Sequence, residues 1–189
     1  GVWDDQPRRD VILAARIRDQ AAVAYSFAEG FARTLPETFR RKLVFRRSPR
    51  LEIEYRGDGG PHVLRAIAAD GKSALGAGPT FVIMDERAFW PDGRGEELEE
   101  ALLTACGKRG ARALIMSTSA DSDAHAFSQW VDRPPAGTYV QEHRAPPGHP
   151  ADDLPSLLEA NPGAGHGVGA SPDWLQAAAH RAIQRGGSA

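Results

Sequence analysis

The stretch FVIMDE, residues 81–86, places four consecutive apolar residues directly before two carboxylates, Asp85 and Glu86. A short apolar run of this kind is typical of a strand that is buried on both faces of a parallel sheet. The two acids then stand at the carboxyl end of the strand, which is the edge where open α/β sheets bind their ligands. The stretch therefore predicts an α/β fold with a ligand site at Asp85 and Glu86.

The sequence on either side alternates between strand and helix patterns. Buried parallel strands are predicted at residues 11–15, 114–116 and 138–143, and helices after Asp19 and over residues 96–106 and 124–131. In the helix after Asp19, the residues that recur along one apolar face, which is expected to face the core, are Val23, Phe27 and Phe31. The alternation predicts a three-layer α/β domain with a mostly parallel central sheet.

Two regions depart from this alternation. Residues 43–68 consist of short β-prone runs that are broken by turn sequences, and they predict a small antiparallel insertion. Beyond residue 144 the chain becomes loop-like, with a short helix near 154–159 and a helix over 172–184 that Ser171 caps. We therefore expect a core over residues 1–150 and a linking helical segment over 151–189.

Composition excludes several classes of protein. The 189 residues include a single cysteine, Cys106, which excludes a disulfide framework or a cysteine-based zinc cluster. The six histidines lack ligand spacing, and no apolar run is long enough to cross a membrane. The amino-terminal sequence also lacks the pattern of a secretory signal. These features predict a soluble, intracellular protein.

Positive charge is concentrated between residues 33 and 50, with one acidic residue, Glu37, among seven basic ones. The seven are Arg33, Arg40, Arg41, Lys42, Arg46, Arg47 and Arg50. Such a segment could contact phosphates, and replacing Arg46 and Arg47 would then reduce the salt dependence of DNA binding. Alternatively, it forms an edge strand whose charges prevent strand pairing with other molecules.

Two adjacent acids at a strand end can take separate roles in nucleotide hydrolysis. One holds Mg²⁺ through water, and the other polarises the water that attacks the γ-phosphate, as in the Walker B motif of P-loop ATPases. A strand that merely ends in a polar turn gives the same short pattern. Ser117 and Thr118 follow the strand at 114–116, and their hydroxyls could either sense the γ-phosphate or cap the next helix.

Residues 66–73, AIAADGKS, fit a loose phosphate-loop pattern in which Ala replaces the first Gly. A phosphate loop requires a helix directly after its GKS, so that the amino end of the helix faces the phosphates. Here ALGAGP follows, and the strand of FVIMDE begins at once. We therefore interpret residues 66–73 as a loop that does not cradle a nucleotide, and we expect a phosphate loop to precede the chain.

Four segments are distinctive when they are taken together: residues 11–27 (VILAARIRDQAAVAYSF), 64–90 (LRAIAADGKSALGAGPTFVIMDERAFW), 114–120 (LIMSTSA) and 157–175 (LLEANPGAGHGVGASPDWL). Together they resemble the ATPase domain of the large terminase subunit, the motor that packages DNA into phage heads. They occur in the family's order across nearly the whole chain. FVIMDE is shared with many ATPases, so the order and the Asn-Pro region supply most of the specificity.

The resemblance implies a P-loop NTPase-like fold of the ASCE type, with ATP and Mg²⁺ as cofactors. It assigns catalysis to Glu86 as base, Mg²⁺ binding through water to Asp85, and coupling of hydrolysis to motion to Ser117 and Thr118. Lys72 is a candidate to reach the phosphates of a neighbouring subunit. The implied partners are double-stranded DNA, the portal protein, the small terminase subunit and further copies in a ring, in the cytoplasm of a bacterial host.

Two family features are absent from the 189 residues, namely the phosphate loop with its lysine and the acidic nuclease domain. Without that loop the amide groups and the point charge that bind the γ-phosphate are missing, so we expect little ATPase activity from this chain alone. Two alternatives stay open. The chain could be a fragment of a helicase-like motor, or a non-catalytic remnant or binding module with the same fold.

Overall fold

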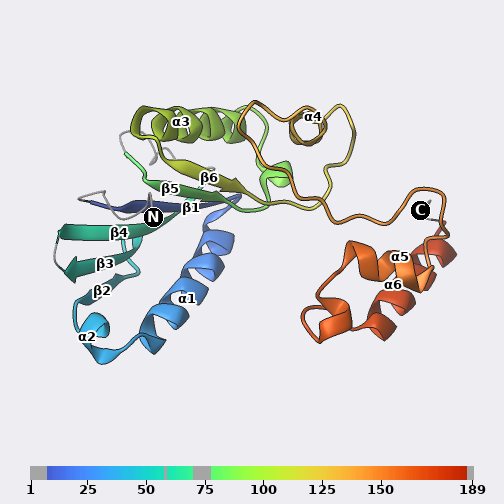
Figure 1. Cartoon of the computed structure of the whole chain (residues 1–189), viewed down its shortest axis with the longest axis horizontal. Helices are drawn as coiled ribbons and strands as arrows, with labels where there is room; N and C mark the ends of the chain where they lie inside the picture. The colour runs from blue at the N-terminus through green and yellow to red at the C-terminus, as the bar shows by residue number, and fades with distance from the viewer. Residues whose placement is uncertain (1–7, 58, 70–77, 187–189) are drawn as a thin grey trace. The chain divides into compact units, whose positions relative to one another are not determined.

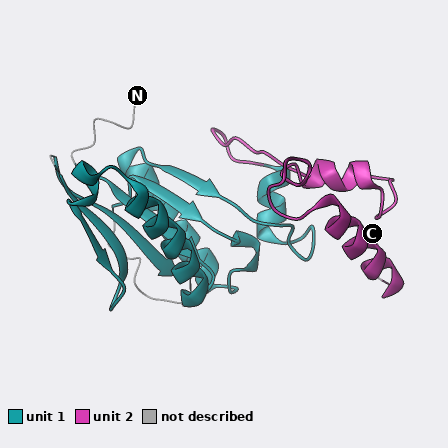
Figure 2. Cartoon of the chain, turned by 90° about the horizontal axis from the view of Figure 1, so that it is seen from below, with its two compact units in different colours: residues 1–133 teal, residues 134–189 magenta. Residues whose placement is uncertain are grey.

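The computed structural model describes residues 8–57, 59–69 and 78–186 of the chain, which is drawn in Figure 1. It divides into two compact units, residues 1–133 and 134–189, which Figure 2 distinguishes by colour. The sheet belongs to the first unit, and the second consists of loops and short helices. None of the described helices is both long and apolar enough to cross a membrane.

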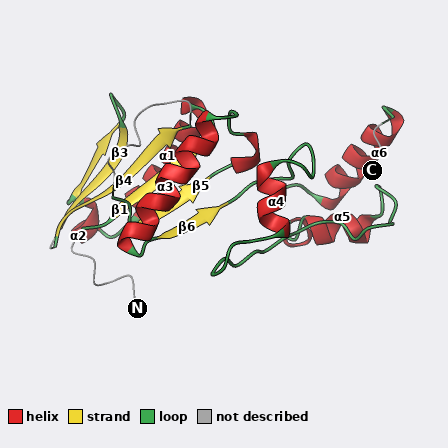
Figure 3. Cartoon of the chain, turned by 90° about the horizontal axis from the view of Figure 1, so that it is seen from above, coloured by secondary structure: helices red, strands yellow, loops and turns green. Residues whose placement is uncertain are grey.

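Six strands form one mixed sheet in the order β2-β3-β4-β1-β5-β6 (Figure 1), and Figure 3 shows the strands in yellow. Their bounds are β1 Asp10–Ala15, β2 Leu43–Arg46, β3 Leu51–Gly57, β4 Gly60–Ala68, β5 Phe81–Met84 and β6 Arg112–Ile115. β1 pairs in parallel with β4 and β5, β5 pairs in parallel with β6, and β2, β3 and β4 pair antiparallel. The predicted mostly parallel sheet with an antiparallel part is thus confirmed, and the antiparallel strands extend one side of that sheet.

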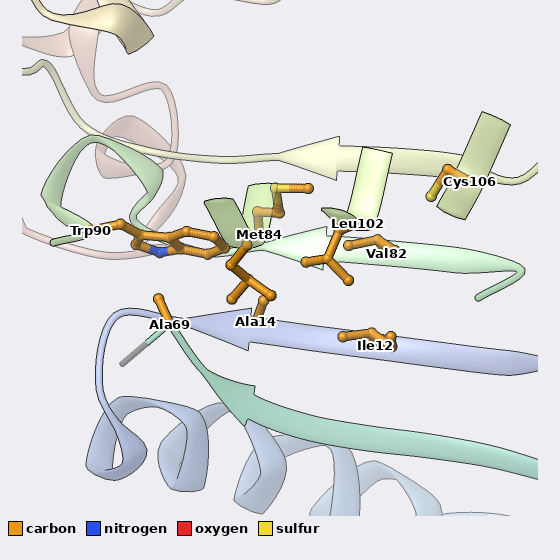
Figure 4. Packing of buried hydrophobic residues seen from close by; sticks show 9 residues of the cluster. Ile12, Ala14, Ala69, Val82, Met84, Trp90, Leu102 and Cys106 are labelled. Carbon is orange, nitrogen blue, oxygen red and sulfur yellow. The ribbon is translucent and has the colours of Figure 1, made fainter. Parts of the chain in front are cut away.

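Successive residues of a strand point to opposite sides of the sheet, so an apolar strand has side chains to bury on both faces. Helices cover both faces of this sheet. On one face Ile12 and Ala14 of β1 join a buried cluster with α3 (Arg94–Arg109), shown in Figure 4. On the other face Leu13 and Ala15 pack with residues of α1 (Arg18–Thr34). The remaining elements of this unit are α2 (Glu37–Arg40), the 3₁₀ helix η1 (Arg87–Phe89) and α4 (Ala126–Asp132).

The predicted helix after residue 19 exists as α1, but the prediction of its buried face is wrong. Val23, Phe27 and Phe31 are 56%, 66% and 74% exposed, whereas Ala21 and Tyr25 are buried. The sheet-facing side is lined with small alanines, which let the helix lie close to the strands. The Tyr25 hydroxyl donates to the carbonyl of Glu52 on β3 across that contact (3.3 Å).

Two strand predictions also need correction. Residues 112–115 form β6, but β6 lies at the edge of the sheet and Leu114 is 44% exposed, so the strand is not buried as expected. Residues 138–143 contain no strand, and Tyr139 is 85% exposed. A strand requires a neighbouring strand that forms hydrogen bonds with its backbone N–H and C=O groups. Residues 138–143 have a β-prone sequence but pair with no described strand.

The second unit contains α5 (Leu154–Ala160), the 3₁₀ helix η2 (Ala164–His166) and α6 (Pro172–Gln184). The Ser171 hydroxyl accepts from the amide of Trp174 (3.2 Å), so the predicted cap of the last helix is confirmed. At the start of α5, the Asp153 carboxylate accepts from the Ser156 amide and hydroxyl, and these bonds lower the pKa of Asp153. Both helices therefore begin at side-chain caps.

Three of the seven basic residues in the 33–50 segment are engaged in ion pairs. Arg33 and Arg47 both bind the buried Glu29 carboxylate at 2.6 Å, and Arg46 on β2 binds Glu52 at 2.8 Å. The Arg33 guanidinium also lies over the ring of Phe45, 4.5 Å from its centroid. Arg33 and Arg47 therefore connect α1 to β2 and the residue after it, whereas Arg46 connects β2 to β3.

Glu29 makes stability depend on pH. Hydrogen bonds from Arg33, and then from Arg47, lower the pKa of Glu29 below its ordinary value of 4.5. A lowered folded-state pKa means that the carboxylate stabilises the fold fully above pH 4.5 and loses this contribution as the pH falls below it. We expect Glu29→Gln to reduce the free energy of unfolding at pH 7 by about 1–3 kcal/mol.

Urea unfolding at pH 7 and at pH 3 measures this contribution. The difference between the variant and the wild type should shrink at pH 3, because pH 3 lies below the ordinary pKa of 4.5, so the unfolded state then binds a proton at Glu29 and the stabilisation by the carboxylate is reduced. Glu37→Gln is the matched control, since Glu37 is exposed and forms no ion pair within the described residues. A difference that is equally large at both pH values would contradict the assignment.

Candidate functional site

The four parallel strands place their carboxyl ends at one edge of the sheet. β5 leads to Asp85 and Glu86, and β6 leads to Ser117 through Met116. Backbone hydrogen bonds continue the sheet into these turns: the Asp85 amide donates to Ala14 (2.8 Å), and the Met116 amide donates to Met84 (2.9 Å). The acidic and hydroxyl side chains predicted from the sequence therefore lie on neighbouring strand ends.

Asp85 is held at this edge through its backbone. Its amide continues the β1–β5 ladder, and its carbonyl accepts from the indole N–H of Trp90 (2.9 Å). The residue is half-buried, and no described residue forms an ion pair or a hydrogen bond with its carboxylate. The described residues therefore give the Asp85 carboxylate no structural partner.

Glu86 adopts an unusual backbone conformation. Its φ of 50° is the only positive value at a non-glycine residue in the described part of the chain. This left-handed conformation is costly for residues with a Cβ, and it recurs at functional sites. The side chain is exposed, and its Oε2 accepts from Nε2 of Gln20 (2.8 Å).

Ser117 connects the end of β6 to the turn that carries the acids. Its hydroxyl accepts from the Ala88 amide (3.0 Å), and the neighbouring Met116 carbonyl accepts from the Arg87 amide (3.1 Å). Thr118 is exposed at the same edge. The structure thus brings Asp85, Glu86, Ser117 and Thr118 together, whereas Lys72 lies outside the described residues, as does most of the GKS-containing loop that follows β4.

The structure adds residues that the sequence did not single out. Arg87 is only 3% exposed, its Nε lies 2.7 Å from the Glu99 carboxylate on α3, and its guanidinium lies 5.5 Å from the Trp90 ring centroid. Figure 4 shows Trp90 beside Met84 in the same core. These contacts fix the turn after Asp85 and Glu86 to α3. Gln20, the partner of Glu86, comes from the first turn of α1.

The donor set of this edge bears on the metal that it could hold. Within the described residues, no group of three or more His, Cys, Asp or Glu side chains could enclose a metal ion. A single free carboxylate at a ligand-binding edge fits Mg²⁺, which keeps several waters and binds proteins through one or two carboxylates together with substrate phosphates. Asp85 meets that requirement, and Cys106 does not contribute, because it is buried and burial raises the pKa of its thiol.

The architecture defines a class: a three-layer α/β protein with an acidic pair at the carboxyl edge of a central strand. No protein-family model matches the sequence, and neither does any curated protein. Among solved structures, the fold is similar to that of the large terminase of bacteriophage HK97, with a TM-score of 0.75 and 24% identity over 93% of this chain. The large terminase of a thermophilic bacteriophage matches 69% of this chain, with a TM-score of 0.51 and 13% identity.

The chain has the large-terminase fold, and it covers only part of such a protein. It matches 36% of the length of the HK97 large terminase and 32% of that of the thermophilic phage. The predicted resemblance to the terminase fold is therefore confirmed at the level of structure.

Proposed function

We propose that this chain forms part of the ATPase motor of a phage large terminase, which packages double-stranded DNA by hydrolysing ATP. The acidic pair Asp85–Glu86 carries this proposal, because it occupies the ligand edge of a central strand in a chain of this fold. Neither carboxylate forms an ion pair within the described residues, and the one hydrogen bond to Glu86 comes from the neutral amide of Gln20.

In this proposal each residue of the edge has a separate role. Asp85 holds Mg²⁺ through water, and the ion, when bound, neutralises charge on the nucleotide phosphates. Glu86 accepts a proton from the water that attacks the γ-phosphorus, while the bond to the ADP oxygen breaks. Ser117 and Thr118 report the state of the γ-phosphate, and Lys72 contributes to phosphate binding from a neighbouring subunit.

The intact motor would have the partners that the resemblance implies. They are duplex DNA, the portal protein, the small terminase subunit and further copies of the subunit in a ring, inside a bacterial host cell. Residues 1–150 would belong to the motor core, and residues 151–189 would lead towards a nuclease domain. Contacts to DNA would be made mainly to phosphates, because packaging has to ignore sequence.

The first experiment compares two products of the same gene: the 189-residue chain and a longer product that includes a GxxxxGK[ST] sequence. We expect the longer product to hydrolyse Mg²⁺-ATP, and the 189-residue chain to show little or no turnover, because its sequence supplies no phosphate loop. A phosphate-release assay measures both. Robust turnover by the 189-residue chain would contradict the expectation that hydrolysis requires a phosphate loop.

The same preparations separate the alternatives. If calorimetry shows no ATP binding even by the longer product, the motor proposal fails and a non-catalytic remnant or binding module is the better account. A second motor domain in the complete gene, in place of a nuclease domain, would favour a helicase-like protein.

The ion pairs of the basic segment change the choice of residues for a DNA-binding test. Arg46 and Arg47 are already paired, so they are poor candidates for phosphate contacts. Arg40, Arg41 and Lys42 are consecutive and exposed, and no described residue forms an ion pair with them. We therefore expect these three to contribute most of the segment's attraction for DNA.

Replacing Arg40, Arg41 and Lys42 together by Gln should weaken duplex binding and flatten its salt dependence. The slope of log K against log salt should fall by up to about 3, since each phosphate contact contributes roughly 0.9. Fluorescence anisotropy at several salt concentrations measures this slope. The double variant Arg46→Gln with Arg47→Gln is the control, and a larger loss of slope in that control would reverse the assignment.

A further inference from the structure

Gln20 lies beside the proposed catalytic base although 66 positions separate the two residues in the chain. β1 leads into α1, whose first turn contains Gln20, and β5 leads into Glu86. Because β1 and β5 are neighbours in register, with Ala14 opposite Met84, the turns that follow them meet at the same edge. The side-chain amide nitrogen of Gln20 lies 2.8 Å from Oε2 of Glu86.

The orientation of the Gln20 amide is determined by this contact. Only its NH₂ group can donate, so a flipped amide would place its oxygen against the carboxylate. The other end of the amide, Oε1, is buried and has no hydrogen-bond partner within the described residues. A buried polar atom without a partner lowers stability. The contact with Glu86 is therefore maintained at a cost to folding.

Two groups of contacts restrain Glu86. The backbone around it is fixed by hydrogen bonds from Arg87 to Met116, from Ala88 to Ser117 and from the Trp90 indole to Asp85. The exposed carboxylate would rotate about its side-chain bonds if nothing held it. Gln20 is the only described residue for which a hydrogen bond to that carboxylate is found.

We propose that Gln20 is a positioning residue, which holds the Glu86 carboxylate at the sheet edge and leaves Oε1 of Glu86 free to accept a proton from water. This inference rests on the proposed function, in which Glu86 is the base. A neutral amide suits the task, because it restrains the carboxylate without the full positive charge that would compete with a metal ion for it. Orientation of this kind raises the rate of the chemical step and leaves nucleotide binding unchanged.

NMR spectroscopy of the 189-residue chain tests the contact directly, without any need for hydrolysis. The side-chain NH₂ signals of Gln20 are identified by their loss in Gln20→Met, which has a similar length and no donor. At pH 7 one of the two protons should resonate downfield, because it donates to a charged acceptor. That shift should disappear in Glu86→Gln and persist in the matched control Asp85→Asn.

Kinetics of a longer, ATP-hydrolysing product test the role. Gln20→Met should lower kcat by roughly tenfold or more and leave KM for ATP unchanged. A rate loss of this size corresponds to the loss of one hydrogen bond to a charged group. Gln20→Glu, which brings a second negative charge to Glu86, should lower kcat at least as much. If Gln20 had only a structural role, Gln20→Met would lower the free energy of unfolding, but it would not lower kcat at an unchanged KM.

The outcomes separate this inference from the proposed function. If Glu86→Gln abolishes hydrolysis but Gln20→Met hydrolyses ATP normally, Gln20 has no positioning role and Glu86 remains the base. If Glu86→Gln hydrolyses ATP normally, the proposed function itself fails. A Gln20 signal that is unchanged in Glu86→Gln, or that responds only to Asp85→Asn, would overturn the contact.

Discussion

Replacing Glu86 by Gln in a longer, ATP-hydrolysing product of the gene is expected to abolish turnover while ATP still binds. Glutamine has the size of glutamate, and its side-chain oxygen can still accept the hydrogen bond from Gln20. It cannot, however, accept a proton from the attacking water. Loss of a general base lowers a rate by roughly 10²–10⁴-fold. Because the phosphate contacts do not involve Glu86 in this proposal, the affinity for ATP should change little.

Phosphate release under saturating Mg²⁺-ATP, together with calorimetric ATP binding, measures the two effects separately. Glu97→Gln is a matched control, because Glu97 is an exposed acid in the first turn of α3 whose carboxylate forms no ion pair or hydrogen bond within the described residues. The control should hydrolyse ATP at the wild-type rate. Normal turnover by the Glu86 variant would remove this residue from its role. A loss of ATP binding in that variant would instead indicate that Glu86 holds the nucleotide.

Local sequence patterns predicted where strands and helices form better than they predicted which residues of those elements are buried. The run FVIMDE predicted β5 and the position of its acids, and the Ser171–Pro172 pair predicted the start of α6, because caps and buried runs are local features. Periodicity located α1 but assigned its large residues to the core. It cannot reveal that Ala21 and its neighbouring alanines bring the opposite side of the helix against the sheet.

The candidate site could be predicted only in part, for a related reason. Asp85 and Glu86 follow directly from one strand, and Ser117 from another. The contact between Gln20 and Glu86 depends on which strands are neighbours and on their register, and no local pattern encodes that. The exposure of β6 likewise depends on its position at the edge of the sheet, which an apolar run does not reveal.

Removal of the Trp90 side chain is expected to destabilise the first unit more than any exposed substitution. Trp90 is 3% exposed, and it packs with Met84 and Leu102 in the cluster between the sheet and α3 (Figure 4). A Cβ on Gly95 would lie 2.6 Å from that of Trp90, so α3 approaches this residue closely. Trp90→Ala should lower the free energy of unfolding by about 3–5 kcal/mol, as for other large-to-small substitutions of buried aromatic residues.

A second variant separates the packing of Trp90 from its hydrogen bond. Trp90→Phe keeps an aromatic ring but loses the N–H that donates to the Asp85 carbonyl, so it should cost only about 1–2 kcal/mol. Urea unfolding followed by circular dichroism measures both, with Phe27→Ala, at a first-unit position that is 66% exposed, as the control. If Trp90→Ala were as mild as this control, the cluster would not anchor the turn. If Trp90→Phe cost as much as Trp90→Ala, the hydrogen bond to Asp85 would outweigh packing, and the acidic pair would depend chiefly on that one N–H.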